Sequence, residues 1–90
     1  MGAARFALGR SVITRAAADK LHPEDVSAAL ARHRSGDWGE LGEADREANE
    51  VSLAQGLRLL SVYHDRGGIR FWIITEADRS ATTILLPEDY

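Results

Sequence analysis

The spacing of hydrophobic residues changes near residue 57, from the three-to-four-residue period of helices to the alternation of strands. Three helices are predicted before this point, over residues 15–21, from residue 23 to the glycine at 36, and over residues 43–55. Three strands are predicted after it, over residues 59–63, 69–75 and 81–86, with polar turns between them. Helices followed by a group of strands are typical of an α+β domain.

The predicted helices carry start and stop signals. Thr14 can cap the first helix by accepting a hydrogen bond from a free amide, and Pro23 suits the first position of the second. Gly56 is well placed as the left-handed residue that ends the third helix. A stripe of small apolar residues in that helix predicts close packing against a neighbour; it consists of Ala44, Ala48, Val51 and Ala54.

Residues 71–74 are apolar at every position, so this strand is expected to be the central and most buried one. The predicted fold is a C-terminal three-stranded antiparallel meander, with about three helices and a short N-terminal strand packed on it. The N-terminal strand, or extended arm, contains Phe6, Leu8, Val12 and Ile13. The strand after Arg79 is then outermost, and its edge could pair with a copy of the same chain.

Composition places all these elements in a single domain, residues 1–90, with one thin core. Hydrophobic residues make up 44% of the chain and charged residues 28%, which is typical of globular rather than disordered sequences. Without cysteines, a signal-peptide core or a membrane-spanning apolar run, the chain is expected in the cytoplasm. The net charge of −3 argues against general nucleic-acid binding and suits a protein partner.

His33, Asp37 and Trp38 form the first group of candidate binding residues. His33 closes a predicted helix, where the helix dipole favours a protonated imidazole, and Asp37 follows four residues later. The pair could act in acid–base chemistry within a cleft, or His33 could cap the helix end and touch Trp38. Trp38 itself could anchor a partner or fill the core beneath its loop.

Asp45 and Asn49 share one face of the third predicted helix with Ser52. This polar column could line a pocket, stay in solvent or form hydrogen bonds with the sheet. The last role is favoured for Asn49, because its amide donates and accepts at the same time and can satisfy a strand end.

Glu76, Asp78 and Arg79 make the densest polar group, in the turn before the last strand. They could bind a metal, a phosphate or a basic peptide, but a turn between two apolar strands is polar in any case. No cofactor is expected, because the chain has no phosphate-binding glycine motif. No metal site is expected either, because the three histidines fall on different elements without the short ligand spacings of zinc sites.

Four segments of the chain resemble a group of short bacterial proteins that are often carried on plasmids, prophages and other mobile elements. The segments are RHRSGDWG from Arg32, EADREAN from Glu43, RLLSVY from Arg58 and WIITEADRSATTILLP from Trp72. The likeness extends from residue 8 to residue 90, and the last segment is its most specific part. It implies a free-standing protein rather than a fragment of an enzyme, and it brings no catalytic residues to carry over.

The first functional hypothesis is an accessory protein that binds another protein, for example as an inhibitor of a host defence complex. Its contact surface would combine residues 36–41 with residues 76–80, and its acids would occupy a basic nucleic-acid channel. The alternative is a minimal nuclease-like hydrolase in which His33, Glu76 and Arg79 converge in one cleft. A sequence-specific nucleic-acid module is a third hypothesis, and it requires a positive patch around Arg66 and Arg70.

Overall fold

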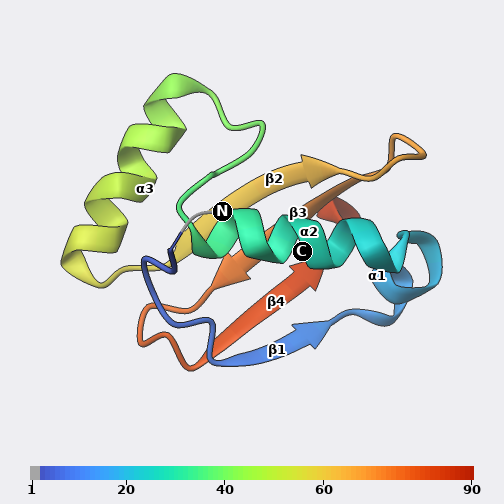
Figure 1. Cartoon of the computed structure of the whole chain (residues 1–90), viewed down its shortest axis with the longest axis horizontal. Coiled ribbons are helices and arrows are strands. Elements are labelled where there is room, and N and C mark those ends of the chain that lie inside the picture. Colours follow the sequence, from blue (N-terminus) through green and yellow to red (C-terminus); the bar gives the residue numbers. More distant parts are fainter. Residues whose placement is uncertain (1–2) are drawn as a thin grey trace.

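The computed structural model describes residues 3–90, which form three helices, four strands and a short 3₁₀ turn (Figure 1). Their bounds are β1 (Arg10–Ile13), α1 (Arg15–Lys20), α2 (Pro23–Arg34), α3 (Glu43–Gln55), β2 (Leu59–His64), β3 (Arg70–Thr75), β4 (Ala81–Leu85) and η1 (Pro87–Asp89). The predicted helices and the three predicted C-terminal strands are therefore present, with ends that differ by at most two residues. Of the predicted N-terminal strand or arm, which begins at Phe6, only residues 10–13 form a strand. Thr14 caps α1 as predicted, since its hydroxyl accepts a 3.2 Å hydrogen bond from the amide of Ala17.

The four strands form one mixed sheet in the order β1-β4-β3-β2. β3 lies in the middle of the predicted antiparallel meander, with Ile73 opposite Ser61 of β2 and Ile84 of β4. β1 adds a fourth strand, which runs parallel to β4. The prediction that the strand after Arg79 lies at the edge is wrong, because the N-terminal strand pairs along its whole length. The edge strands are β1 and β2.

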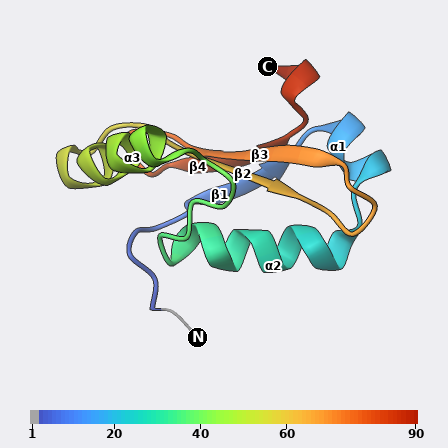
Figure 2. The same cartoon turned by 90° about the horizontal axis from the view of Figure 1, so that it is seen from above.

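Helix α2 covers one face of the sheet and leaves the opposite face without a helical layer (Figure 2). The core lies between α2 and the sheet, and α1 contributes Ala17 to it. Phe71 and Ile73 point into this core and are 0% exposed. The residues that alternate with them, Trp72 and Ile74, point to the uncovered face. None of the helices in residues 3–90 has the length and apolar character needed to cross a membrane.

Helix α3 lies beside β2 rather than over a face of the sheet (Figures 1 and 2). Asn49 attaches it there: its Nδ2 donates to the carbonyl oxygen of Leu60 at 2.5 Å, and its Oδ1 accepts from the Leu60 amide at 3.2 Å. This is the role predicted for Asn49. The predicted packing of the alanine stripe is wrong, since Ala44 and Ala48 are exposed and Val51 is 52% exposed. Such small side chains bury too little apolar area to hold a helix on a sheet.

The segment between α2 and α3, residues 35–42, forms backbone hydrogen bonds with the outer edge of β2. The Glu40 amide donates to the carbonyl oxygen of Val62 at 2.7 Å, and the Val62 amide donates to that of Trp38 at 3.3 Å. Gly39 permits this close approach, because its φ is +74° and a Cβ there would collide with the carbonyl oxygen of Val62. With Asn49 bound to Leu60, the outward-facing backbone in the middle of β2 is already paired.

Replacing Asn49 by alanine is expected to lower the free energy of unfolding by about 2 kcal/mol, because both backbone groups of Leu60 lose their partner. The matched control is Glu47→Ala on the exposed side of the same helix, for which a change within about 0.5 kcal/mol is expected. Urea denaturation of the wild-type protein and both variants measures the difference. Equal stability of the two variants would contradict the role assigned to Asn49.

Candidate functional site

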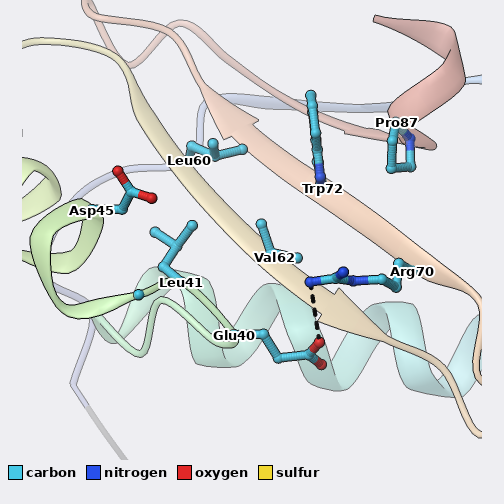
Figure 3. Close-up of a pocket in the computed structure, with 9 residues that line it drawn as sticks. Glu40, Leu41, Asp45, Leu60, Val62, Arg70, Trp72 and Pro87 are labelled. Carbon is cyan, nitrogen blue, oxygen red and sulfur yellow. Dashed lines mark ion pairs between the residues drawn. The ribbon is translucent and has the colours of Figure 1, made fainter.

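A groove with a volume of about 450 Å³ lies on the sheet face that α2 leaves uncovered (Figure 3). Leu60 and Val62 of β2 and Trp72 of β3 form its floor. In Figure 3 the side chain of Leu60 lies between Asp45 of α3 and the indole of Trp72. The groove is completed by Glu40, Leu41, Gly42, Arg70 and Pro87.

The carboxylates of the groove differ in their surroundings. Glu40 forms an ion pair with Arg70, with 3.8 Å between Oε1 and Nη2, and its other oxygen contacts Nδ1 of His64. Asp45 is exposed and has neither a hydrogen-bond nor an ion-pair partner within residues 3–90. One neutralised and one free carboxylate therefore border the apolar floor.

Trp72 gives the groove its largest aromatic surface. The indole is only partly buried, and its edge packs against the ring of Tyr90 with 5.5 Å between ring centroids. Tyr90 is 74% exposed. An indole at the border of an apolar floor and solvent can receive an apolar side chain or the cationic group of a ligand. The arrangement is suited to binding.

His33, the first residue of the enzyme hypothesis, lies in the core and is 0% exposed. Its Nδ1 is 2.5 Å from Oγ of Ser61, and its Nε2 is 2.8 Å from Oγ1 of Thr75. Thr75 Oγ1 is in turn 2.8 Å from Oγ1 of Thr82, which donates to the carbonyl oxygen of Leu8 at 2.7 Å. The chain of hydrogen bonds joins α2 to β2, β3 and β4.

The hydroxyl protons of this network determine the state of His33. Because Thr82 donates its proton to Leu8, Thr75 must donate to Thr82 and accept from Nε2–H of His33. Nε2 of His33 therefore carries a proton, and when the imidazole is neutral Ser61 donates to Nδ1. Burial, together with a smaller effect of the positive charge of Arg79, lowers the pKa of His33 from 6.5 to about 4. The predicted protonated imidazole is wrong, because desolvation outweighs the helix dipole here.

A serine that donates to a histidine resembles the first step of nucleophilic catalysis. Ser61, however, is 0% exposed. The rings of Phe6 and Trp38 cover the imidazole, with centroid distances of 5.2 Å and 5.8 Å. The Ser61–His33 pair therefore faces packed protein in the described structure, and its evident role is to hold the core together.

Asp37 and Trp38 stabilise the segment that follows α2. The carboxylate of Asp37 accepts two hydrogen bonds from Arg32, at 2.7 Å and 3.2 Å, and one from the amide of Gly39, at 3.1 Å. The Arg32 guanidinium lowers the pKa of Asp37. Trp38 is 4% exposed, and its Nε1 donates to Glu50 at 2.8 Å. Of the two roles predicted for Trp38, its position corresponds to filling the core beneath the loop.

Glu76, Asp78 and Arg79 have partners around their own turn. Glu76 accepts a 3.3 Å hydrogen bond from Arg58, and the hydroxyl and amide of Ser80 lower the pKa of Asp78. Arg79 has a φ of 61°. Its guanidinium connects the turn to the segment before β2 through hydrogen bonds. Nη1 of Arg79 donates to the carbonyl oxygens of Leu57 at 2.7 Å, Glu76 at 3.0 Å and Ala77 at 3.2 Å.

The three residues of the enzyme hypothesis do not share a pocket. His33 is bound on the core side of the sheet, whereas Glu76 lines a hollow of about 170 Å³ on the uncovered side. The two segments of the proposed contact surface, residues 36–41 and 76–80, are separated by Phe6. Its ring is stacked on Trp38 at 6.0 Å, and the guanidinium of Arg79 lies 5.7 Å from its centroid.

Residues 3–90 contain neither a metal-binding cluster nor a positive patch free of carboxylates around Arg66 and Arg70. Within residues 3–90, no group of three or more histidine, cysteine, aspartate or glutamate side chains could hold a metal ion. Arg66 forms a 2.9 Å ion pair with Asp25 and lowers the pKa of that carboxyl to about 2. Arg70 lies beside Glu40. The arginines that the nucleic-acid hypothesis requires are thus next to carboxylates.

The sequence prediction missed the apolar floor of the groove. Of the lining residues, Asp45 is among the predicted binding residues, and Glu40 and Leu41 belong to the predicted contact surface of residues 36–41. Trp72 could have been found from the alternation within residues 70–75: if Phe71 and Ile73 face the helices, Trp72 must face the other side. The prediction also missed Glu50, which accepts hydrogen bonds from Arg5 and Trp38. No short-range pattern marks that residue, because its partners are remote in the sequence.

Comparison with known proteins does not assign this chain to a family. No protein-family model matches the chain, and neither the curated proteins nor the solved structures give a significant match. What the domain does must therefore be inferred from the groove and its residues.

Proposed function

We propose that this chain is a small accessory domain that binds another protein through the groove on its uncovered sheet face. The occupant is a segment of the partner that carries an apolar side chain next to a lysine or arginine. The observation that carries the proposal is the free carboxylate of Asp45 beside the apolar floor of Leu60, Val62 and Trp72. A cation adjacent to an apolar side chain complements this pair of features.

The two parts of the groove contribute differently to binding. Trp72 supplies apolar contact area, and the loss of a hot-spot tryptophan costs about 2 kcal/mol or more, which is roughly 30-fold in Kd. Asp45, at the rim, attracts a basic segment and orients it, so its charge acts mainly on the association rate and on salt dependence.

The acidic surplus of the chain supports a basic partner, since a net charge of −3 attracts cationic surfaces over longer distances. An inhibitor that occupies the basic nucleic-acid channel of a host defence complex is one concrete form of this proposal. In that form the domain competes with nucleic acid for the channel, and its association weakens as salt is raised.

A selection from a displayed random-peptide library tests the proposed function, with calorimetry to measure the affinity of synthetic peptides and stopped-flow fluorescence to measure their association rate. The selected peptides are expected to contain a basic residue next to an apolar one. Trp72→Ala is expected to weaken their binding about 30-fold, and Asp45→Lys to slow association and remove most of its salt dependence. The matched control is Asp19→Lys, the same charge change on the exposed surface of α1.

Three results would contradict the proposal: no enriched peptides, enrichment of acidic peptides, or equal affinity of all four proteins. Far-ultraviolet circular dichroism of each variant shows whether the fold is retained. Because Trp72 is only partly buried and Asp45 is exposed, folded variants are expected.

A further inference from the structure

β1 is the open edge of the sheet. It pairs with β4 on one side, and no strand or helix of residues 3–90 lies along its other side in Figure 1. The amide of Arg10 donates to Ser80 at 2.9 Å, and the amide of Thr14 donates to Ile84 at 3.0 Å. Because backbone groups alternate in direction along a parallel ladder, those of Ser11 and Ile13 point away from the sheet. Unpaired backbone groups at an edge are available to another strand.

The side chains of β1 are unusually apolar for an exposed strand. Val12 is 41% exposed on the uncovered face of the sheet, and Ile13 is 40% exposed on the face that carries α2. Ile13 also borders a hollow of about 200 Å³, whose other lining residues are Ala18, Leu21, Pro23 and Val26. Apolar surface is therefore available on both sides of the strand.

We propose that β1 pairs with β1 of a second copy of this chain in antiparallel orientation, with Val12 opposite Val12. In this register Ser11 of each copy faces Ile13 of the other, and each of these pairs exchanges two backbone hydrogen bonds. The two Val12 side chains then become close neighbours on the uncovered face.

Only this register uses both outward-facing residues of the strand. A ladder centred on Ser11 would require an extended residue 9, but Gly9 has a φ of +66°. A ladder centred on Ile13 would require an extended residue 15, which begins α1. The other edge cannot substitute, because Asn49, Trp38 and Glu40 already pair with the middle of β2.

Charge complementarity supports a second copy as the occupant. The Val12-centred register places Arg10 opposite Thr14 of the second copy, on the same face of the sheet. The hydroxyl of Thr14 donates a 2.7 Å hydrogen bond to the carboxylate of Asp89, so a negative charge lies beside Thr14. Arg10 has no ion-pair partner within residues 3–90 of its own chain, and two Arg10–Asp89 pairs would form across the symmetric interface.

The proposed dimer would place the grooves of both copies on the same side. A two-fold axis perpendicular to the sheet joins the two four-stranded sheets into one, with both α2 helices on the same face. Both uncovered faces, each with its groove, then lie together on the opposite side. A partner with two basic segments could bind both grooves and gain affinity from the linkage. The dimer itself does not depend on the proposed function.

Disulfide cross-linking tests the register, because the chain has no cysteine of its own. Val12→Cys is expected to form a covalent dimer under mild oxidation, since directly opposed residues of this kind bring their Cβ atoms to about 4.5–5.5 Å. The matched control is Val51→Cys on α3, a valine outside the proposed interface that is 52% exposed, against 41% for Val12. We expect cross-linking of Val12→Cys to be at least about 10-fold faster.

Sedimentation equilibrium over an approximately 100-fold range of protein concentration tests the dimer without a cross-link. The wild-type protein is expected to form a dimer as the concentration rises. Ser11→Pro is expected to remain monomeric and folded, because its missing amide hydrogen points away from β4. Arg10→Asp, which faces Asp89 of the second copy, is expected to raise the dissociation constant at least about 10-fold, unlike the same charge change in Arg34→Asp on α2.

Three results would overturn the proposal. The first is a wild-type protein that stays monomeric at all concentrations. The second is equal cross-linking of the two cysteine variants. The third is a folded Ser11→Pro variant that dimerises like the wild type. If Ser11→Pro does not fold, the cross-linking comparison still decides the register.

Discussion

Replacing His33 by alanine is expected to lower the free energy of unfolding by about 3–5 kcal/mol. The change removes a fully buried ring and leaves the hydroxyls of Ser61 and Thr75 without their partner. A domain of this length has a stability of roughly 5–13 kcal/mol, so a large share would be lost. Thermal and urea denaturation measure the loss.

The control for this prediction is His64→Ala. The chemical change is the same, but the His64 side chain is 59% exposed at the end of β2. Within residues 3–90, Glu40 is its one ion-pair partner. A loss of at most about 1 kcal/mol is expected there. If the two histidine variants were equally stable, the network around His33 would not be the structural centre that its geometry indicates.

Lowering the pH from 7 to 5 is expected to destabilise the wild-type protein by about 2 kcal/mol through His33 alone. The pKa of the imidazole is about 4 in the folded state and about 6.5 in the unfolded state. Between these values the unfolded chain binds more protons, so stability falls as the pH falls below about 6.5. The loss approaches about 3 kcal/mol near pH 4 and then levels off for this residue.

The variant His33→Gln separates this effect from those of other groups, because glutamine keeps a donor and an acceptor but does not titrate. Its stability is expected to change much less between pH 7 and pH 5. The carboxylates of Asp25 and Glu50 have pKa values lowered to about 2, so their contributions are lost only at lower pH.

Nuclear magnetic resonance of the imidazole nitrogens provides a direct check of the same prediction. It is expected to show the neutral Nε2–H tautomer throughout the range from pH 7 to pH 5. A wild-type pH slope equal to that of His33→Gln, or an imidazole that titrates near 6.5, would contradict the assignment.

Several residues that look functional in the sequence have structural partners in the fold. His33, Trp38 and Arg79 are polar or aromatic residues near turns and helix ends, where binding residues are common. In the structure, His33 and Trp38 are buried, and the Arg79 guanidinium is bound to backbone carbonyls. A sequence shows which groups could bind or react, but the exposure that makes them available depends on packing between remote segments.

The secondary structure could be predicted because its signals are local. Thr14 and Gly56 mark helix ends through their own backbone and side-chain chemistry, and both occupy the positions expected of them. The central place of β3 was also predictable, because a run of apolar residues such as 71–74 favours the interior of a sheet, and β3 has a neighbouring strand on each side.

The position of β1 beside β4 was not predictable in this way, since the pairing joins residues about seventy positions apart and a four-residue strand carries no signal for its neighbour. The same is true of α3. Its alanines indicated packing, but the two hydrogen bonds from Asn49 to Leu60 place the helix beside the sheet. This placement leaves a sheet face open and thereby creates the groove.

The sequence by itself determined the helices, the three C-terminal strands and the apolar centre of the sheet, because propensity, capping and alternation act within a few residues. Only the tertiary structure decided which strand lies at the edge, which face remains uncovered and which polar side chains reach solvent. These properties depend on contacts between segments far apart in the chain, and many arrangements of the same elements satisfy the local rules equally well.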